Sequence, residues 1–448
     1  MLHKYRFLTL GMLVILFTAS GCFDLFAVPG VSVSPNGEAV YFLSGSNDAM
    51  MSDEGEFISS LTAVSVNDGS TIVIAEGSDT VLISAFDVNP ADSSVAYVRS
   101  EEEGGTTIEL FSGGSSEIVA DLPANTIGTM AQFSPDGAYL AVTVVVLPEE
   151  LDGMDTDNLT DEQFDSIEYA LYLVDMADYS ATVINDTSTS RANTMAWSPD
   201  STRLVYNAWI DSNADGVIDT APPFDEEAIM SAPVIDLSQL FVYSVADGST
   251  TQIDTTSVDY SPAFVSDDQV AFVALDYANV MMGSLPAIMV YDFGSGETTS
   301  VYQAQGIITG IALSPDGTQV AWTEGAADDS NEDNPPGILQ IADTDFNSQM
   351  SISVDVSALP DSPVWLNNDT VLVSASNILG SLVGSFTVSL TGGEAESDST
   401  FPMQQILAVN TTDGTIEILY EGAMLNSSFA TSLIVLIDSG SLDDMGFE

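Results

Sequence analysis

The chain has 448 residues, of which 67 are Asp or Glu and only five are Lys or Arg, so its formal net charge is −62 at pH 7. A negative field of this size repels nucleic acid and attracts Ca²⁺, other cations and basic partners, so we expect no nucleic-acid partner. Apolar residues still make up 45% of the chain, enough for a large core, which excludes a disordered polyanion.

Residues 1–22 have the features of an export signal. Lys4 and Arg6 form a positive start, residues 7–17 are apolar, and small residues precede Cys22. Such a segment is a signal peptide and is too short for a stable transmembrane helix. The run Ala19-Ser20-Gly21-Cys22 resembles the bacterial lipobox. The resemblance implies cleavage before Cys22 and acylation of its sulfur and its new amino group, whereas the alternative is an ordinary signal with a chance cysteine.

We therefore expect a lipoprotein signal peptide over 1–21, a lipidated Cys22 with a short tether over 22–30, and one domain over 31–448. Two or three acyl chains would anchor the protein stably in a membrane. Phe23 follows Cys22, where Asp would favour retention at the inner membrane of a Gram-negative cell. The outer membrane or the cell surface is thus the expected location.

A pair of short apolar strands joined by a turn of Pro, Asp, Asn or Gly recurs along the chain. The seven pairs are predicted at 31–34 and 39–43, 86–89 and 95–98, 131–134 and 139–145, 195–198 and 204–206, 263–266 and 270–274, 311–314 and 320–323, and 364–366 and 371–375. A second hairpin follows, most clearly at 63–75, 240–248, 288–296 and 406–414. Three of these contain Asp-Gly, the strongest short hairpin signal, because such turns need positive φ.

Four short antiparallel strands in each repeat are typical of a propeller blade. The sequence therefore predicts an all-β fold, a β-propeller of seven four-stranded blades. Residues 433–437 read as one more strand, which either completes the first blade and latches the ring or, with residues from 424 onward, forms half of an eighth blade. Eight blades is the alternative.

The Ser-Pro-Asp-Gly turn before an apolar strand resembles the repeat of TolB-type and WD-repeat-like propellers. Residues 134–137 and 314–317 carry it complete, whereas Ser201 replaces Gly after 198–200 and Asn36 replaces Asp within 34–37. The resemblance implies the fold and, by analogy only, a role in assembling the cell envelope.

The strand order of a blade sorts its connections onto two faces. The turns between strands one and two and between strands three and four share one face, here called the turn face. The joints between strands two and three lie on the opposite insert face, and the chain is long there, at 146–169, 209–239, 276–287, 324–337 and 376–405. Long loops on a rigid scaffold commonly bind ligands, so we expect a protein or glycan partner on the insert face; neutral drift in exposed loops is the alternative.

One insert contains the pattern D-x-N-x-D-G-x-I-D. Its oxygen ligands would be Asp211, Asn213, Asp215, the carbonyl of Val217, and Asp219, with Asp225, Glu226 or Glu227 in the place of the usual last carboxylate. Alternating carboxylates and amides around a sharp glycine turn suit the six to eight oxygens that Ca²⁺ prefers. We expect a structural Ca²⁺ site that clips this insert, and a plain Asp-rich turn is the alternative.

Removal of the signal leaves no His and no Lys, and Arg99, Arg191 and Arg203 as the only cationic side chains. This excludes a Ser-His-Asp triad, His-ligated zinc, a Schiff base and a P-loop lysine. Carboxylate chemistry remains, and a glycoside hydrolase would need two or three carboxylates converging at the central channel. We expect a non-enzymatic binding or scaffold protein of the cell envelope, with a glycoside hydrolase or a TolB-like assembly factor as alternatives.

Overall fold

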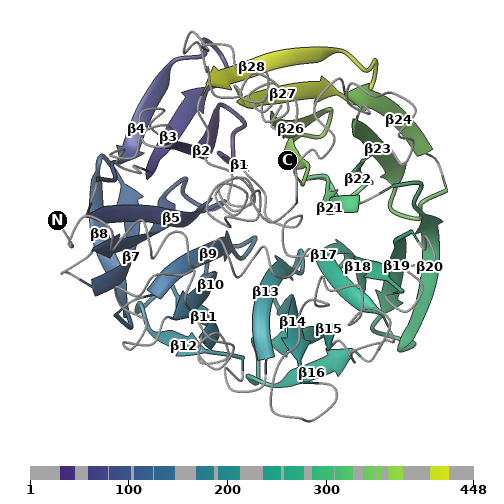
Figure 1. The fold of residues 1–448 in the computed structure, drawn as a ribbon, viewed down its shortest axis with the longest axis horizontal. Coiled ribbons are helices and arrows are strands. Elements are labelled where there is room, and N and C mark those ends of the chain that lie inside the picture. The colour runs from purple at the N-terminus through teal and green to yellow at the C-terminus, as the bar shows by residue number, and fades with distance from the viewer. Residues whose placement is uncertain are drawn as a thin grey trace, which may run out of the picture.

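The computed structural model describes residues 31–45, 59–78, 80–101, 105–124, 126–146, 168–185, 190–211, 236–253, 257–276, 285–306, 308–325, 337–347, 349–354, 362–376 and 404–422. These residues form seven four-stranded antiparallel sheets arranged around a central axis (Figure 1). The predicted seven-bladed β-propeller is thereby confirmed. Within the described ranges, no helical segment has the length and apolarity needed to cross a bilayer.

Each blade consists of four strands that follow one another in the sequence. Blade 1 contains β1 (Val31–Val33), β2 (Ala39–Gly45), β3 (Ser59–Ser65) and β4 (Thr71–Ala75). Blade 2 contains β5 (Val81–Val88), β6 (Val95–Glu101), β7 (Gly105–Ser112) and β8 (Ser115–Leu122). Blade 3 contains β9 (Thr126–Phe133), β10 (Tyr139–Val146), β11 (Glu168–Asp175) and β12 (Ala181–Val183). Blade 4 contains β13 (Ser190–Trp197), β14 (Arg203–Ile210), β15 (Leu237–Ser244) and β16 (Thr250–Ile253).

The remaining three blades follow the same order. Blade 5 contains β17 (Val258–Ser266), β18 (Gln269–Leu275), β19 (Ala287–Asp292) and β20 (Glu297–Gln303). Blade 6 contains β21 (Ile308–Leu313), β22 (Gln319–Glu324), β23 (Gly337–Asp343) and β24 (Gln349–Val354). Blade 7 contains β25 (Val364–Asn367), β26 (Thr370–Ser376), β27 (Gln404–Asn410) and β28 (Ile416–Gly422). The first strand of each blade lies nearest the axis (Figure 1).

The hydrophobic core is divided among the seven gaps between neighbouring blades. Each gap holds one cluster of buried side chains contributed by the two blades that flank it. The second strands are buried on both faces and read as continuous apolar runs; in β10 all positions but the two ends are buried. The fourth strands are exposed at the rim, as in β4. This division explains how a chain of such high charge keeps a large core.

The turns between the first and second strands are fixed by the serine that begins them. In blade 3 the Ser134 hydroxyl donates to Asp136 Oδ1 at 2.7 Å and accepts the N–H of Tyr139 at 2.9 Å. Gly137 takes a φ of +71°, which favours glycine. Ser198 and Ser314 repeat this arrangement in blades 4 and 6.

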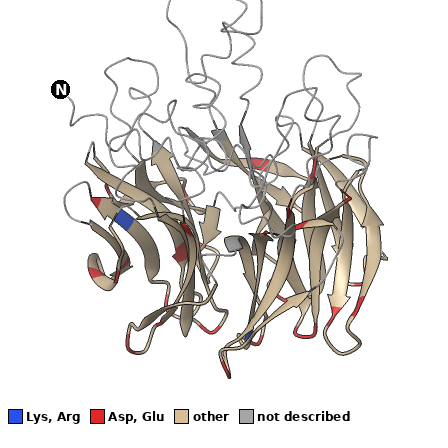
Figure 2. Ribbon diagram, turned by 60° about the horizontal axis from the view of Figure 1, so that its bottom comes forward, with Lys and Arg blue, Asp and Glu red and all other residues tan. Residues whose placement is uncertain are grey.

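Asp side chains also fix the turns between the third and fourth strands. Asp68 accepts hydrogen bonds from the N–H of Ser70 at 3.1 Å and from the Ser70 hydroxyl at 2.7 Å. Asp247 accepts the same pair of hydrogen bonds from Ser249, and Asp413 accepts them from Thr415. These hydrogen bonds hold the pKa of each carboxyl below its usual value. Figure 2 shows acidic residues along these turns at the lower edge of the ring. Part of the acidity is therefore used to build the turn face.

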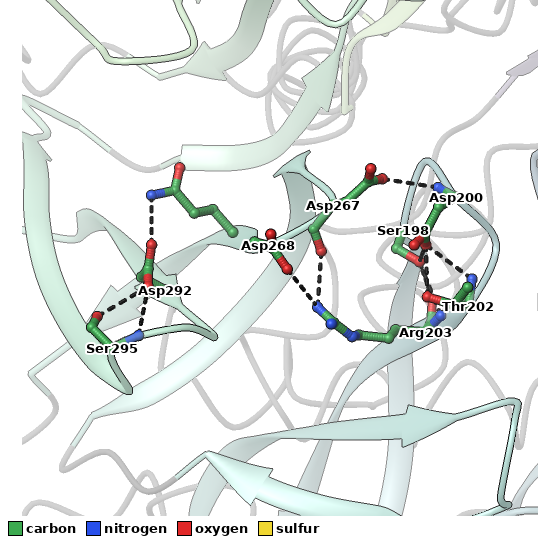
Figure 3. A network of polar contacts seen from close by, with 9 residues as sticks. Ser198, Asp200, Thr202, Arg203, Asp267, Asp268, Asp292 and Ser295 are labelled. Atoms are coloured by element: carbon green, nitrogen blue, oxygen red, sulfur yellow. Dashed lines mark hydrogen bonds and ion pairs between the residues drawn. The ribbon is translucent and has the colours of Figure 1, made fainter.

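Neighbouring turns are joined from blade to blade. The N–H of Asp136 donates to Ser201 Oγ at 3.1 Å, and the N–H of Asp200 donates to Asp267 Oδ1 at 3.0 Å. Arg203 strengthens the second contact, because its Nη1 lies 2.9 Å from Asp267 O and 3.5 Å from Asp268 Oδ1 (Figure 3). Its guanidinium also lies 4.7 Å from the ring centre of Phe293 in blade 5.

Blades 1 and 7 close the ring by side-chain packing, since each is a complete sheet of its own four strands. Their shared cluster includes Val31, Phe42 and Leu366. The rings of Phe42 and Tyr420 lie 4.5 Å apart, centre to centre. The strand predicted at 433–437, and the alternative half-blade from 424, lie outside the described residues.

Candidate functional site

The two faces of the ring differ in the lengths of the connections between strands, as predicted. In every blade except blade 2, the joint between the second and third strands spans a long stretch, at 46–58, 147–167, 211–236, 276–286, 325–336 and 377–403. Five of these joints were predicted, and the joint at 46–58 was missed. β1 starts and β28 ends on the same insert face, because strands alternate in direction within each blade.

The predicted ligand and lipid residues lie mostly outside the part of the chain that the structure describes. Asp211 directly follows β14, whereas Asn213, Asp215, Val217, Asp219, Asp225 and Glu226 lie outside the described residues of that insert, and Cys22 precedes the first described residue. Within the described ranges, no three His, Cys, Asp or Glu residues are grouped closely enough to hold a metal ion. Calcium binding and lipidation therefore stay predictions.

A cavity of about 560 Å³ occupies the centre of the ring and is lined by the inner strands of all seven blades. This volume is in the usual range for small-molecule sites. The turn residues Pro135, Pro199 and Pro315 contribute to its wall, so the cavity extends to the turn face. Among the described residues that line it, Asp87 is the only one with a charged side chain.

Seven lining residues occupy the same register position in each blade, where the inner strand pairs with equivalent residues of the second strand. We call them the inner ring. In blade order they are Ser32, Asp87, Gln132, Ala196, Ala263, Ala312 and Val364. The first three, the polar arc, come from adjacent blades 1 to 3. The other four, the apolar arc, come from blades 4 to 7. The inner ring is thus polar on one side and apolar on the other.

Asp87 is held between its two neighbouring blades. Its Oδ1 accepts the hydroxyl of Ser32 in blade 1 at 2.6 Å, and its Oδ2 accepts the N–H of Phe133 in blade 3 at 2.7 Å. Burial raises the pKa of Asp87 to about 6, and hydrogen bonds from Ser32, Phe133 and Val88 act in the opposite direction. The side chain therefore changes charge near neutral pH while it links three blades.

Gln132 places an acceptor beside this carboxylate. It precedes Phe133 in β9, and its Oε1 is buried without a hydrogen-bond partner among the described residues. Buried polar atoms of this kind call for an explanation, because an unmade hydrogen bond costs about 1–3 kcal/mol. On the polar arc the Ser32 hydroxyl already donates to Asp87, and Gln132 carries two amide N–H donors beside its unpartnered Oε1.

The inner strands of blades 2 to 6 each contain a β-bulge at an equivalent place, nearer the insert face. Polar side chains of the wall satisfy the groups that the bulges free. Thr129 donates to the carbonyl of Thr143 at 3.1 Å, and the N–H of Thr194 donates to Asn207 Oδ1 at 2.7 Å. Bulges re-aim side chains and commonly occur near functional sites. Here their polar groups bond within the wall, which leaves recognition to the inner ring.

The hydrolase alternative predicted two or three carboxylates at the channel. Asp87 is the only carboxylate in the described lining, so that part of the channel does not support the prediction. Three other described acids, Asp236, Asp259 and Glu324, are buried outside the lining. Glu324 accepts the Tyr302 hydroxyl at 2.8 Å, and Asp259 accepts the Ser257 hydroxyl at 2.8 Å.

Sequence reasoning missed Asp87 and the inner ring. A signal was present, because Asp87 is the only acid at its repeat position and interrupts an inner strand that is otherwise apolar there. Aligning the seven turns would have exposed the contrast between blades 1 to 3 and blades 4 to 7.

Comparison with solved structures supports the fold. A puromycin-hydrolyzing peptidase of Mycobacterium tuberculosis gives a TM-score of 0.55 at 12% identity over 91% of this chain and 55% of that chain. An oligogalacturonate lyase solved with manganese gives 0.51 at 14% identity, over 90% and 91% of the two chains. TolB of Acinetobacter baumannii gives 0.41 at 13% identity, over 86% and 82%.

At such identities the likeness concerns the fold alone, and the chain spans about half the length of the peptidase. No protein-family model matches the sequence, and no curated protein matches it significantly.

Proposed function

We propose that the protein is a lipid-anchored, non-enzymatic binding protein of the cell envelope that receives a protein or glycan partner on its insert face. The observation that carries this proposal is the contrast between the faces. Hydrogen-bonded turns close one face, whereas six of the seven blades send long joints from the other. Binding surfaces are commonly built from such joints on a rigid scaffold.

The start of β1 supports an orientation for the anchored protein. Val31 lies at the insert face, and residues 23–30 separate it from Cys22. Eight residues reach at most about 28 Å when fully extended. A lipid on Cys22 would therefore hold the insert face toward the membrane, and the partner would be a molecule close to that membrane.

Charge supports a basic partner. The joints at 46–58, 147–167, 211–236 and 325–336 all contain acidic residues and contain no Lys or Arg. Electrostatic attraction of this kind accelerates association and weakens with salt. The predicted Ca²⁺ site in the joint after β14 would hold part of this surface in shape.

Photo-crosslinking from the two ends of one strand tests the proposal. Glu168 begins β11 at the insert face, and Ala177 follows its other end at the turn face; both are exposed. A photoreactive residue at position 168 of the full chain in cells should give a discrete adduct that is lost at about 1 M salt, and position 177 should give none. No adduct, or equal adducts from both positions, would contradict the proposal.

A further inference from the structure

The inner ring combines two opposed surfaces in one cavity, and this combination is independent of any partner on the insert face. The polar arc comes from blades 1 to 3 and the apolar arc from blades 4 to 7. A ligand that touches both arcs needs a polar end and an apolar body. The cavity volume of about 560 Å³ accommodates a small molecule or one large side chain.

The chemistry of the polar end follows from the acceptors on the polar arc. The described donors to Asp87 are Ser32, Phe133 and Val88, and a carboxylate has about four acceptor sites. One site therefore remains for a ligand. Gln132 Oε1 needs a donor as well. An anion would be repelled by the Asp87 carboxylate and by the negative field of the whole chain. A cation with several N–H donors can instead donate to both acceptors, Asp87 and Gln132 Oε1.

The chemistry of the body follows from the apolar arc. Ala196, Ala263 and Ala312 leave room, and Val364 supplies hydrocarbon surface. Phe264 and Trp365 also line the cavity, but both are buried mainly in the gaps between blades. The Trp365 Nε1 group is already used, because it donates to Ala312 O at 3.1 Å. The arc therefore offers hydrocarbon contacts.

We propose that the inner ring binds an organic ammonium ion with an apolar body, its nitrogen on the polar arc and its body on the apolar arc. Access is from the turn face, where three turn prolines line the cavity. The ligand is either a free amine or the basic side chain of a peptide, and the two sources share this chemistry.

Calorimetry on the full-length protein in detergent tests the proposal at pH 7.5 and about 1 M NaCl, where the Debye length of about 3 Å suppresses attraction to the surface. The probes are phenethylamine, its neutral counterpart 2-phenylethanol, and a Phe-Lys dipeptide blocked at both ends. We expect saturable binding of phenethylamine, of the dipeptide, or of both, and at least tenfold weaker binding of the alcohol. The better of the two cationic probes identifies the source.

Three variants locate the site. Asp87→Asn keeps both interblade contacts and should weaken binding of the ammonium probe about 10- to 100-fold. Gln132→Leu removes the second acceptor and should weaken it several-fold. Asp316→Asn removes the same charge from an exposed turn outside the cavity lining and should change nothing. Absence of saturable binding, or equal affinity in all three variants, would overturn the inference without bearing on the insert-face partner.

Discussion

Replacing Asp87 by Asn should change how the stability of the protein depends on pH. The pKa of this carboxyl is about 6 in the folded protein, against an ordinary value of 3.8. Because the folded value is raised, the folded state holds the proton more tightly than the unfolded chain does. The contribution of Asp87 is most favourable below about pH 4 and is lost as pH rises through 6.

The magnitude follows from the two pKa values. Their separation of about two pH units corresponds to about 3 kcal/mol of unfolding free energy. Asn carries no charge and can keep both contacts, with Oδ1 accepting the Phe133 N–H and Nδ2 donating to Ser32 Oγ. For a chain of this length, about 3 kcal/mol corresponds to a difference in Tm of about 3–4 °C.

The assay is thermal unfolding of the wild type and Asp87→Asn from pH 4 to pH 8, without any amine. Only the difference between the two proteins is interpreted, since the other acids act equally in both. The variant should match the wild type near pH 4 and exceed it by about 3–4 °C at pH 7.5. Asp87→Ala should be less stable than Asp87→Asn throughout, because it leaves the Phe133 N–H unpaired. A difference between wild type and Asp87→Asn that does not vary with pH would refute the reasoning.

Four further predictions concern other parts of the molecule. Gly137→Ala should lower the unfolding free energy by about 1–3 kcal/mol more than Gly317→Ala, because both glycines have positive φ but only at Gly137 would a Cβ approach Asn89 Oδ1 to 2.2 Å; equal losses in urea unfolding would contradict this. Arg203→Met should lower the unfolding free energy by about 1 kcal/mol, because it removes the contacts of the guanidinium with Asp268 and Phe293 that join blades 4 and 5, and the loss should be smaller at high salt. An unchanged urea midpoint would argue against a stabilising role for these contacts. Calcium should bind saturably and raise Tm in the wild type but not in Asp215→Ala, whereas no heat at millimolar Ca²⁺ would reduce that segment to a solvated turn. Labelled palmitate should enter the wild type and not Cys22→Ser, and equal labelling of both would exclude the predicted anchor.

The fold could be predicted from the sequence because each repeat is marked by turn residues that are adjacent in the chain. Ser-Pro-Asp-Gly turns and Asp-Gly hairpins each require a specific backbone conformation, and Gly137, Gly248 and Gly414 adopt the positive φ that such turns demand. The predicted inner strands of blades 3 and 4 began too late, at residues 131 and 195, whereas β9 starts at Thr126 and β13 at Ser190. Bulges and small polar residues such as Gly128 and Thr129 break the alternation on which the prediction depended.

The candidate site was less readable because it depends on contacts between blades. Asp87 gains its raised pKa and its two fixed partners only when blades 1 and 3 close around it, and nothing in its local sequence encodes that burial. The unpartnered oxygen of Gln132 likewise emerges only from the assembled wall. Composition and turn motifs predict the propeller fold, whereas Asp87 and Gln132 come together only when the blades are assembled.

The central claim is that Cys22 anchors the propeller with its insert face toward the membrane. The sequence has no cysteine besides Cys22, so a cysteine introduced at Glu168 or Ala177 would be the only other one and could be labelled specifically with a fluorophore. With the protein purified from cell membranes and reconstituted into vesicles containing a bilayer-embedded quencher, position 168 should be quenched much more strongly than position 177, and Cys22→Ser should abolish quenching at both. Equal quenching at the two positions, or stronger quenching at 177, would contradict the account.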